Sequence, residues 1–370
     1  MSASSRSMLN ETIAAITAPS DVWMTQARTH LDALTKPIGS LGRLEDLAAQ
    51  MVAIRQDKFL TPLQKAVFVF AADHGITEEG VSAYPREVTH QMVLNFLAEG
   101  AAINVLARLH HVALHVVDVG VDADFAGIAG LLHCKIRKGT RNMLREAAMS
   151  EDEMMRALEV GIQQADGANA NGHTLLAVGE MGIGNTTAAS AIASVLTRSP
   201  VALVTGKGTG LNASAHEYKC HVVEAIVQKH FGNNFAQNDG SAIAGQTPDP
   251  LDILRCVGGL EIAAMTGMML GAARHRLAIV CDGFISTAAA AMAFAIEPHV
   301  RGYLFAGHQS EEPGHAVLLK YLGLEPILAL NMRLGEGTGA VLAMPILESA
   351  VCLYREMATF TSAGVSEANG

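Results

Sequence analysis

The stretch that decides the fold is Leu175-Leu176-Ala177-Val178-Gly179-Glu180-Met181-Gly182-Ile183-Gly184-Asn185-Thr186-Thr187. A short apolar run leads into a glycine-rich turn, and an alanine-rich segment follows over Ala188–Leu196. This order predicts a buried strand, a tight turn and a helix. A glycine-rich turn before a helix presents free backbone N–H groups and the positive end of the helix dipole to an anion. The stretch therefore predicts a strand–helix unit with an anion site at its turn.

The same pattern recurs along the chain after a helical N-terminal segment, Leu9–Arg55. Short apolar runs precede Gly, Asp or His and then helices: Ala66–Ala72 before Asp73, Leu114–Val117 before Asp118, Val201–Thr205 before Gly206, Leu277–Cys281 before Asp282, Tyr303–Ala306 before Gly307, and Pro326–Leu330 before the loop with Glu336. Strands that alternate with helices indicate parallel βαβ crossovers, and continuous apolar strands indicate helices on both faces. We expect an α/β fold with a mainly parallel sheet, whose ligands bind beyond the carboxyl ends of the strands.

Composition excludes several classes of protein. The chain has 370 residues, of which 50% are hydrophobic and 17% are charged, so it can bury a large core. Its net charge of -10 argues against a nucleic-acid-binding protein, which would carry a basic patch or stripe. No Lys/Arg cluster suits an anionic membrane.

Neither the cysteines nor the apolar runs point to secretion or to a membrane span. The five cysteines are scattered without Cys-x-x-Cys spacing, which indicates buried thiols in a reducing compartment. The polar start, Met1 to Glu11, lacks the apolar stretch of a signal peptide. The apolar stretches Ile262–Ala273 and Ile285–Ile296 are too short to cross a bilayer. We therefore expect a cytoplasmic protein without membrane insertion.

The glycine-rich turn after Val178 nearly matches the phosphate-binding P-loop, which reads Gly, four residues, Gly, Lys, Ser or Thr. Here Asn185 takes the lysine position. Its neutral side chain cannot clamp β- and γ-phosphates, so a nucleoside triphosphate is disfavoured, whereas a monophosphate needs only amides and hydroxyls. A tight connection that binds nothing stays open as the alternative.

A second glycine-rich loop, Gly206-Lys207-Gly208-Thr209-Gly210, is weaker evidence for phosphate. Leu211 stands where the dinucleotide pattern needs its last glycine, so the loop is no evidence for a dinucleotide. Lys219 follows on a predicted helix and either reaches an anion or is a solvated lysine.

Asp73 and His74 suggest a catalytic dyad or metal ligands, but adjacent residues in a turn usually point apart, so a structural role fits equally. The sequence contains fifteen histidines, yet it has neither an HExxH pair nor a clustered His/Asp set. We expect no metal site.

Near the C-terminus, Asn331-Met332-Arg333-Leu334-Gly335-Glu336-Gly337-Thr338-Gly339 sets one carboxylate among glycines directly after an apolar run. Glycine on both sides of Glu336 lets the backbone turn sharply and approach a ligand. An acid at the carboxyl end of a strand lies where open α/β sheets keep their chemistry. The alternative is an exposed acid in a surface turn.

The segment Gly80–Met92 leads into an amphipathic helix. Its Ser82, Tyr84, Gln91 and Met92 would suit a pocket for a flat heteroaromatic ring. A turn followed by a helix start explains the same residues.

Together these motifs resemble the nicotinate-nucleotide–dimethylbenzimidazole phosphoribosyltransferase family of cobalamin nucleotide-loop assembly. The resemblance covers nearly the whole chain. It is carried by Lys36–Glu45, Ala72–Gly75, Gly80–Pro85, Gly179–Thr187, Cys281–Phe284 and Leu334–Gly339. The order of these motifs along the chain makes chance similarity very improbable.

The resemblance implies a homodimer without cofactor, in which each subunit has a Rossmann-like large domain and a small helical domain from both termini. The implied boundaries are 59–345 for the catalytic domain, with 1–58 and 346–370 forming the small domain. It also implies that Glu336 is the catalytic base. The implied nucleotide and phosphate contacts are Gly179, Glu180, Met181, Gly182, Ile183, Gly184, Asn185, Thr186, Gly206, Gly208 and Lys219, and the benzimidazole contacts are Ser82, Tyr84, Gln91 and Leu334.

The family reaction explains why one base is enough. Nicotinate leaves its mononucleotide from a pyridinium and needs no general acid, whereas 5,6-dimethylbenzimidazole must lose its N–H proton after attacking C1′. Attack opposite the departing ring inverts C1′, and Glu180 is a second carboxylate that would stabilise positive charge on the ribose. Asn212-Ala213 replace the two aspartates expected after the second glycine-rich loop, so the role of that loop stays open.

Two other functions remain to be weighed. One is a catalytically inactive protein that binds a nucleotide or a benzimidazole, and the other is a P-loop kinase or ATPase, which Asn185 disfavours. The preferred acceptor base also stays open, because adenine, other benzimidazoles or phenolics would fit a slightly different pocket.

Overall fold

The computed structural model describes residues 3–208, 210–232 and 248–366. Its centre is a parallel sheet in the order β3-β2-β1-β4-β5-β6-β7. The strands are β1 Lys65–Ala72, β2 Ala113–Gly120, β3 Leu131–His133, β4 Leu175–Met181, β5 Ala278–Cys281, β6 Leu304–His308 and β7 Pro326–Leu328. The predicted α/β fold with a parallel sheet is confirmed.

Two details of the predicted sheet are wrong. Val201–Thr205 does not form a strand: α8 (Val201–Val204) is a single helical turn that follows Pro200. A short apolar run does not by itself distinguish a strand from a helix, and here Leu203 is exposed and not sandwiched between layers. The edge strand β3 was not predicted, because it has only three residues and lies partly exposed.

The strand order reverses between β1 and β4, which pair side by side with Phe70 opposite Glu180. Crossovers from β1 run one way through β2 and β3, and those from β4 run the other way through β5, β6 and β7. In open parallel sheets a crevice forms at this switch point, beyond the carboxyl ends of the strands. The glycine-rich turn after β4 therefore starts at the edge where a ligand site is expected.

Helices cover both faces of the sheet, which is why every residue of β1 is buried. On one face α11 contacts β1, β2, β4 and β5 and packs against α6 and α12, while on the other α5 contacts β2 and α14 contacts β4 to β7. The helices are α1 Ala3–Ala15, α2 Asp21–Asp32, α3 Arg43–Arg55, α4 Val88–Leu97, α5 Ala102–Leu109, α6 Glu151–Ala170, α7 Asn185–Thr197, α9 Ala213–Phe231, α10 Pro250–Val257, α11 Leu260–Arg274, α12 Phe284–Ile296, α13 Pro313–Leu322, α14 Thr338–Glu356 and α15 Phe360–Ala363.

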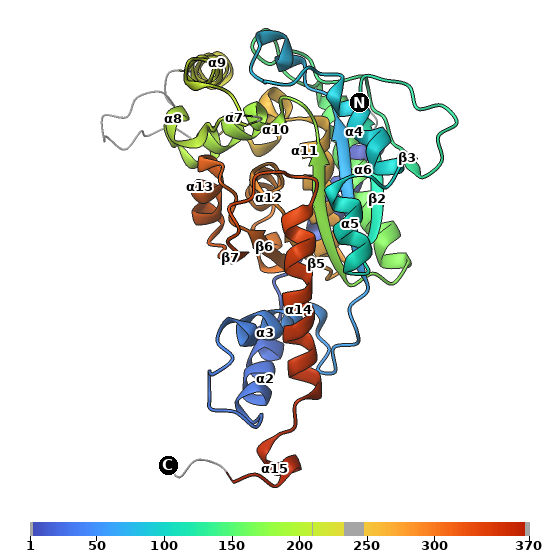
Figure 1. Ribbon diagram of the computed structural model, residues 1–370, viewed down its shortest axis with the longest axis vertical. Coiled ribbons are helices and arrows are strands. Elements are labelled where there is room, and N and C mark those ends of the chain that lie inside the picture. Colours follow the sequence, from blue (N-terminus) through green and yellow to red (C-terminus); the bar gives the residue numbers. More distant parts are fainter. Residues whose placement is uncertain (1–2, 209, 233–247, 367–370) are drawn as a thin grey trace.

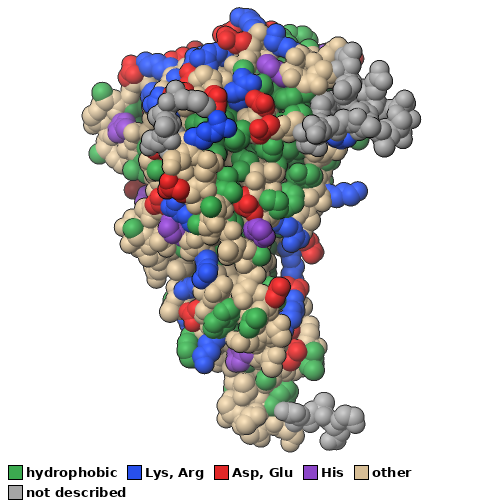
Figure 2. Space-filling view, turned by 180° about the vertical axis from the view of Figure 1, so that it is seen from behind, with side chains coloured by type: hydrophobic (Ala, Val, Ile, Leu, Met, Phe, Trp, Pro, Cys, Tyr) green, Lys and Arg blue, Asp and Glu red, His purple; other side chains and the backbone are tan. Residues whose placement is uncertain are grey.

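Helix α14 connects the sheet to a separate group of helices. It starts beside the carboxyl edge of the sheet and runs down past α2 and α3 toward α15 (Figure 1). An isolated bridge between Leu34, just after α2, and Thr359, just before α15, joins these segments there. Figure 2 shows the same broad upper part and narrow lower part from behind, with acidic and basic side chains interspersed over that face.

One stretch of the described residues, Val88–Leu109, is long and apolar enough to cross a membrane by length and composition. It consists of two helices, α4 and α5, with a break that ends at Ala101, the N-cap of α5. A membrane-spanning helix needs about 20 continuous residues, and neither helix has that length.

Candidate active site

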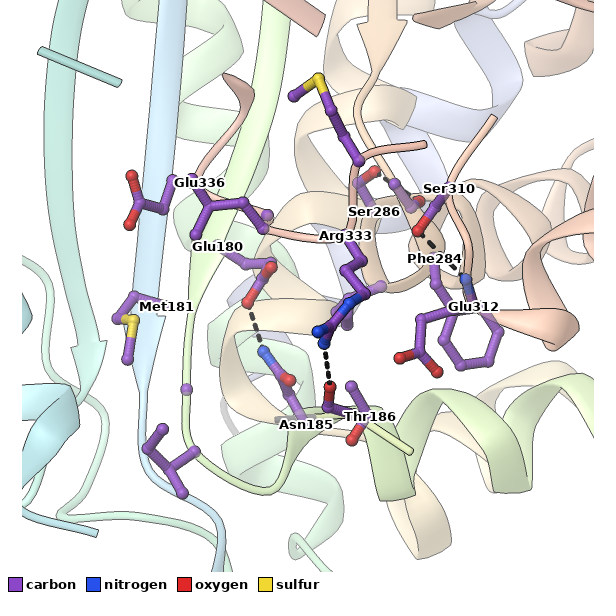
Figure 3. A pocket seen from close by; sticks show the side chains of 18 of the residues that line it. Glu180, Met181, Asn185, Thr186, Phe284, Ser286, Ser310, Glu312, Arg333 and Glu336 are labelled. Carbon is purple, nitrogen blue, oxygen red and sulfur yellow. Dashed lines mark hydrogen bonds between the residues drawn. The ribbon is translucent and has the colours of Figure 1, made fainter. Parts of the chain in front are cut away.

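A cavity of about 800 Å³ opens at the carboxyl edge of the sheet. It collects the segments that follow β4, β5, β6 and β7 and the start of α4 (Figure 3). Its lining is Tyr84, Val88, Met92, Glu180, Met181, Gly182, Ile183, Asn185, Thr186, Gly208, Gly283, Phe284, Ile285, Ser286, His308, Ser310, Glu312, Met332, Arg333, Leu334, Gly335 and Glu336. The two informative glycine-rich segments of the sequence thus meet in one place.

Glu180 ends the regular part of β4 and is almost fully buried. The Asn185 side-chain amide donates a hydrogen bond to its Oε2. Burial, together with the nearby carboxylates of Glu261, Asp282 and Glu336, raises the pKa of Glu180 to about 8. Glu180 is therefore mostly protonated and neutral at pH 7.

Glu336 lies in the loop before α14 and lines the same cavity (Figure 3). The backbone N–H of Ile103, at the start of α5, donates to its Oε2 at 3.4 Å. Burial raises the pKa of Glu336, and this amide works in the opposite direction. A carboxylate with a raised pKa at a cavity wall has the properties of a general base.

The backbone of the Glu336 loop lies directly on β4. A methyl group added to Gly179 would come within 2.5 Å of the Glu336 carbonyl carbon, so this position on β4 must be glycine. Gly179 does not line the cavity. Because it has no side chain, the loop can pack against β4, and Glu336 and Glu180 both reach the cavity.

The turn after β4 and α9 form an anion corner. Gly184 is the N-cap of α7, with φ of 97°, so the positive end of the α7 dipole lies at this corner. Lys219 of α9 is fully buried, and its Nζ donates to Thr186 Oγ1 at 2.8 Å. Burial lowers the pKa of Lys219 to about 8, and the carboxylate of Glu312 partly offsets that effect.

The opposite wall is apolar and includes Tyr84, Val88, Met92 and Leu334. Tyr84 and Leu334 are both more than half exposed at 55% and 57%, so they border the mouth of the cavity. A flat heteroaromatic ring would fit between such side chains.

Six of the residues predicted for the site are outside the lining of this cavity: Ser82, Gln91, Gly179, Gly184, Gly206 and Lys219. Of these, Gln91 is exposed on α4. Gly206 lines an adjoining cavity of about 610 Å³ together with Lys207 and His216. Thr209 of the second glycine-rich loop lies outside the described residues.

Asp73 and His74 point apart, as their adjacency suggested. The Asp73 carboxylate accepts a hydrogen bond from the Asp122 backbone N–H at 2.7 Å and lies 3.7 Å from Arg86. His74 is completely buried against Glu261, with 2.5 Å between its Nε2 and Oε1. Neither lines the cavity, so both support the structure of the loop after β1.

Sequence reasoning assigned no role to the segments after β5 and β6, although both strand ends were predicted. They supply Phe284, Ser286, His308, Ser310 and Glu312 to the cavity. His315 of α13 fixes this wall: its Nδ1 accepts from the Ser310 backbone N–H at 2.9 Å, and its Nε2 is 3.0 Å from Thr287 Oγ1. Burial lowers the pKa of His315 to about 3, so this histidine is neutral. The polar residues at the ends of β5 and β6 were the sequence signal that could have pointed to this wall of the cavity.

A metal is not suggested by the part of the chain that the structure describes: it contains no group of three or more His, Cys, Asp or Glu residues arranged to hold an ion.

Several known proteins are similar to the chain over nearly its whole length. A family model described as phosphoribosyltransferase matches residues 16–365. The nicotinate-nucleotide–dimethylbenzimidazole phosphoribosyltransferases of Geotalea uraniireducens and Geobacter sulfurreducens are each 50% identical to the chain and cover 97% of it, and 99% of each relative is matched. The crystal structure of the enzyme with that name from Thermus thermophilus superposes with a TM-score of 0.85 at 44% identity, covering 94% of this chain and 100% of the other.

Proposed function

The chain belongs to the nicotinate-nucleotide–dimethylbenzimidazole phosphoribosyltransferase family, and on that premise we propose that it transfers phosphoribose from nicotinate mononucleotide to 5,6-dimethylbenzimidazole. The products are α-ribazole 5′-phosphate, the nucleotide that provides the lower axial ligand of cobalamin, and nicotinate. The observation that carries the proposal is that one cavity is lined both by the start of the anion corner, at Asn185 and Thr186, and by the buried Glu336.

The anion corner takes the 5′-phosphate. A monophosphate is held by the positive end of the α7 dipole, by the Thr186 hydroxyl and by Lys219, whose Nζ already lies 2.8 Å from that hydroxyl. A bound phosphate dianion stabilises the charged form of Lys219 and so offsets the effect of its burial. Asn185 supplies no charge for further phosphates, which matches a mononucleotide.

The benzimidazole occupies the apolar wall and attacks C1′ of the ribose. A bond forms between C1′ and the unprotonated ring nitrogen, and the bond from C1′ to the nicotinate nitrogen breaks. The bonding electron pair returns to the nicotinate ring, and C1′ is inverted from β to α. The cavity contributes by holding two flat rings on opposite sides of C1′.

Glu336 takes the proton from the second nitrogen of the azole. Its raised pKa makes its carboxylate a stronger base than an exposed glutamate, and general-base catalysis contributes about 10²- to 10⁴-fold in rate. Because Glu180 keeps its proton below pH 8, we assign it a neutral hydrogen-bonding role toward the ribose and no ionic stabilisation of positive charge.

Three further features belong to this proposal. The small helical domain of residues 1–58 and 346–370, beside the catalytic domain of residues 59–345, is supported by the packing of α3 against α14 and by the Leu34–Thr359 bridge, whereas α1 packs against α6 and α11 of the catalytic domain. The protein works as a homodimer. It acts in the cytoplasm on soluble substrates.

Chromatographic assay of both products tests the proposal. We expect nicotinate release that depends on added 5,6-dimethylbenzimidazole, with one α-ribazole 5′-phosphate formed for each nicotinate. Tight binding of both substrates without release would instead identify an inactive binding protein. ATP titration by calorimetry should show no binding at concentrations that saturate the mononucleotide.

A further inference from the structure

The side chain of Asp282 caps a helix that belongs to another part of the chain. Asp282 follows β5, and its carboxylate accepts three backbone hydrogen bonds: from Gly337 at 3.1 Å to Oδ2, and from Gly339 at 2.7 Å and Ala340 at 3.1 Å to Oδ1. These amides lie at the start of α14, where N–H groups have no partner within the helix. Gly337, the N-cap of α14, has no side chain with which to satisfy them.

The loop that this carboxylate caps has an unfavourable backbone conformation. Gly335, Glu336 and Gly337 follow one another with φ values of 86°, 63° and 88°. The left-handed region is ordinary for glycine but costs energy for glutamate, because its Cβ approaches the backbone. A non-glycine residue keeps this conformation when its surroundings hold it there.

Asp282 is placed so that it can stabilise the left-handed conformation of this loop. Only 2% of its surface is exposed, and His308, a basic group beside it, has its Nε2 3.7 Å from Oδ1. On its β4 side, the loop packs directly against Gly179. At the start of α14, Gly339 packs against the ring of His308. Within this loop, Gly335 and Glu336 line the cavity, and Glu336 contributes the loop's carboxylate there.

We propose that Asp282 is a positioning residue for the transfer reaction: its carboxylate, fixed on β5, holds the left-handed Gly335–Gly337 turn that directs Glu336 toward the acceptor base. The inference rests on the proposed role of Glu336 as general base. This role would explain the aspartate of the Cys281–Phe284 motif, to which the sequence alone assigns no function. Asp282 itself does not line the cavity, so it acts through Glu336.

Asp282→Asn tests this with little change in size. The asparagine oxygen can replace Oδ1 toward Gly339 and Ala340, but its NH₂ group then meets the Gly337 N–H, donor against donor. A displacement of about 1 Å in a reacting group costs about 100-fold in rate, so we expect kcat to fall by about that factor. The KM for nicotinate mononucleotide should change by less than about threefold, because the anion corner is untouched.

A double-mutant cycle with Glu336→Gln separates positioning from general damage. If Asp282 acts only through Glu336, the double variant D282N/E336Q is as slow as E336Q alone, within about threefold. Asp118→Asn is the matched control: Asp118 is also buried at a strand end, where it accepts from Val121 N–H at 2.9 Å and pairs with Lys135 at 2.8 Å. That variant should lose stability but keep kcat.

Three results would overturn the inference: a near-normal kcat in D282N, a further loss of about 100-fold when D282N is added to E336Q, or an equal loss of kcat in D118N. If D282N does not fold, Asp282→Ser, which keeps one acceptor, goes through the same cycle and is judged by the same results. A near-normal rate in E336Q itself would instead refute the proposed base and not the cap.

Discussion

Two glutamates face the same cavity from two differently built regions. Glu180 belongs to the regular strand β4, is paired with Asn185, and lies among other carboxylates that raise its pKa to about 8. Glu336 belongs to a left-handed loop before α14, and a backbone N–H group at the start of α5 donates to its side chain. Chemically identical side chains are therefore prepared for different roles, one neutral and one available as a base.

The difference shows what each region contributes. The β4–α7 region, with its helix N-terminus and Lys219, is built to hold an anionic nucleotide. The loop before α14 is held by contacts to β4 and β5 and presents one carboxylate to the acceptor. We therefore expect substitutions in the first region to act mainly on binding and those in the second to act mainly on turnover.

The largest effect should come from Glu336→Gln. Without its base the enzyme should lose about 10²- to 10⁴-fold in kcat, while nicotinate mononucleotide binds as before. Steady-state kinetics and calorimetry measure the two quantities. The exposed Glu325→Gln is the matched control and should be indistinguishable from the parent. If Glu336→Gln instead lost nucleotide binding, the proposed distinction between a binding region and a catalytic region would be wrong.

The next largest effect should come from Lys219→Met. Loss of a charge-assisted hydrogen bond to phosphate costs about 1.5–3 kcal/mol, so the Kd for the mononucleotide should rise about 10- to 100-fold with a smaller change in kcat. Lys65→Met removes another buried lysine, which pairs with Glu348 at 2.7 Å, and should lower stability only. Equal nucleotide affinity in K219M and the parent would exclude Lys219 from the anion corner.

Nucleotide affinity should also depend on pH. The free enzyme holds the proton of Lys219 below a pKa of about 8 and loses it above. Binding of the phosphate dianion favours the charged lysine, so affinity should fall by up to about tenfold for each pH unit above 8. Calorimetric titrations between pH 7 and pH 9 measure this, and K219M should lack the dependence. A flat profile in the parent would show that the lysine charge does not matter.

Glu180→Gln should have a small effect at neutral pH, because glutamine resembles the protonated side chain already present. We expect kcat to stay within about tenfold of the parent at pH 7. A loss of about 10³-fold or more there would show that the charged form of Glu180 is needed, and would make the two glutamates more alike than we infer.

Glu180 should also make the stability of the fold depend on pH. The pKa of Glu180 is raised from 4.5 to about 8, so between these values the folded state holds a proton that the unfolded state has lost. The stabilisation is complete below pH 4.5 and is lost as the pH rises through 8, at up to about 1.4 kcal/mol per pH unit. Urea denaturation from pH 5 to pH 8 should show a shallower decline for E180Q. Parallel declines would contradict the raised pKa.

Much of the fold was predictable because each strand carries its own signal. Apolar runs followed by Gly, Asp or His identified β1, β2, β4, β5, β6 and β7, all of which the structure confirms within a few residues. Val201–Thr205 failed because a short apolar run fits either a strand or one helical turn, and only the neighbouring elements decide between them.

The site was predictable only in part. Glu336 and the turn after β4 have distinctive glycine patterns, and both lie in the cavity. The contributions of Phe284, His308 and Ser310 depend on β5 and β6 lying next to β4, which is a property of the sheet order. The cap from Asp282 depends on a contact across 55 residues of sequence, and no local pattern reports such a contact.

A crystal structure with 5,6-dimethylbenzimidazole and the nucleotide site filled tests the central claim most directly. The account predicts a Glu336 carboxylate oxygen within about 2.6–3.2 Å of one azole nitrogen, with the other azole nitrogen facing C1′. An azole that binds in the cavity with its nitrogens away from Glu336, or paired with Glu180 instead, would contradict it.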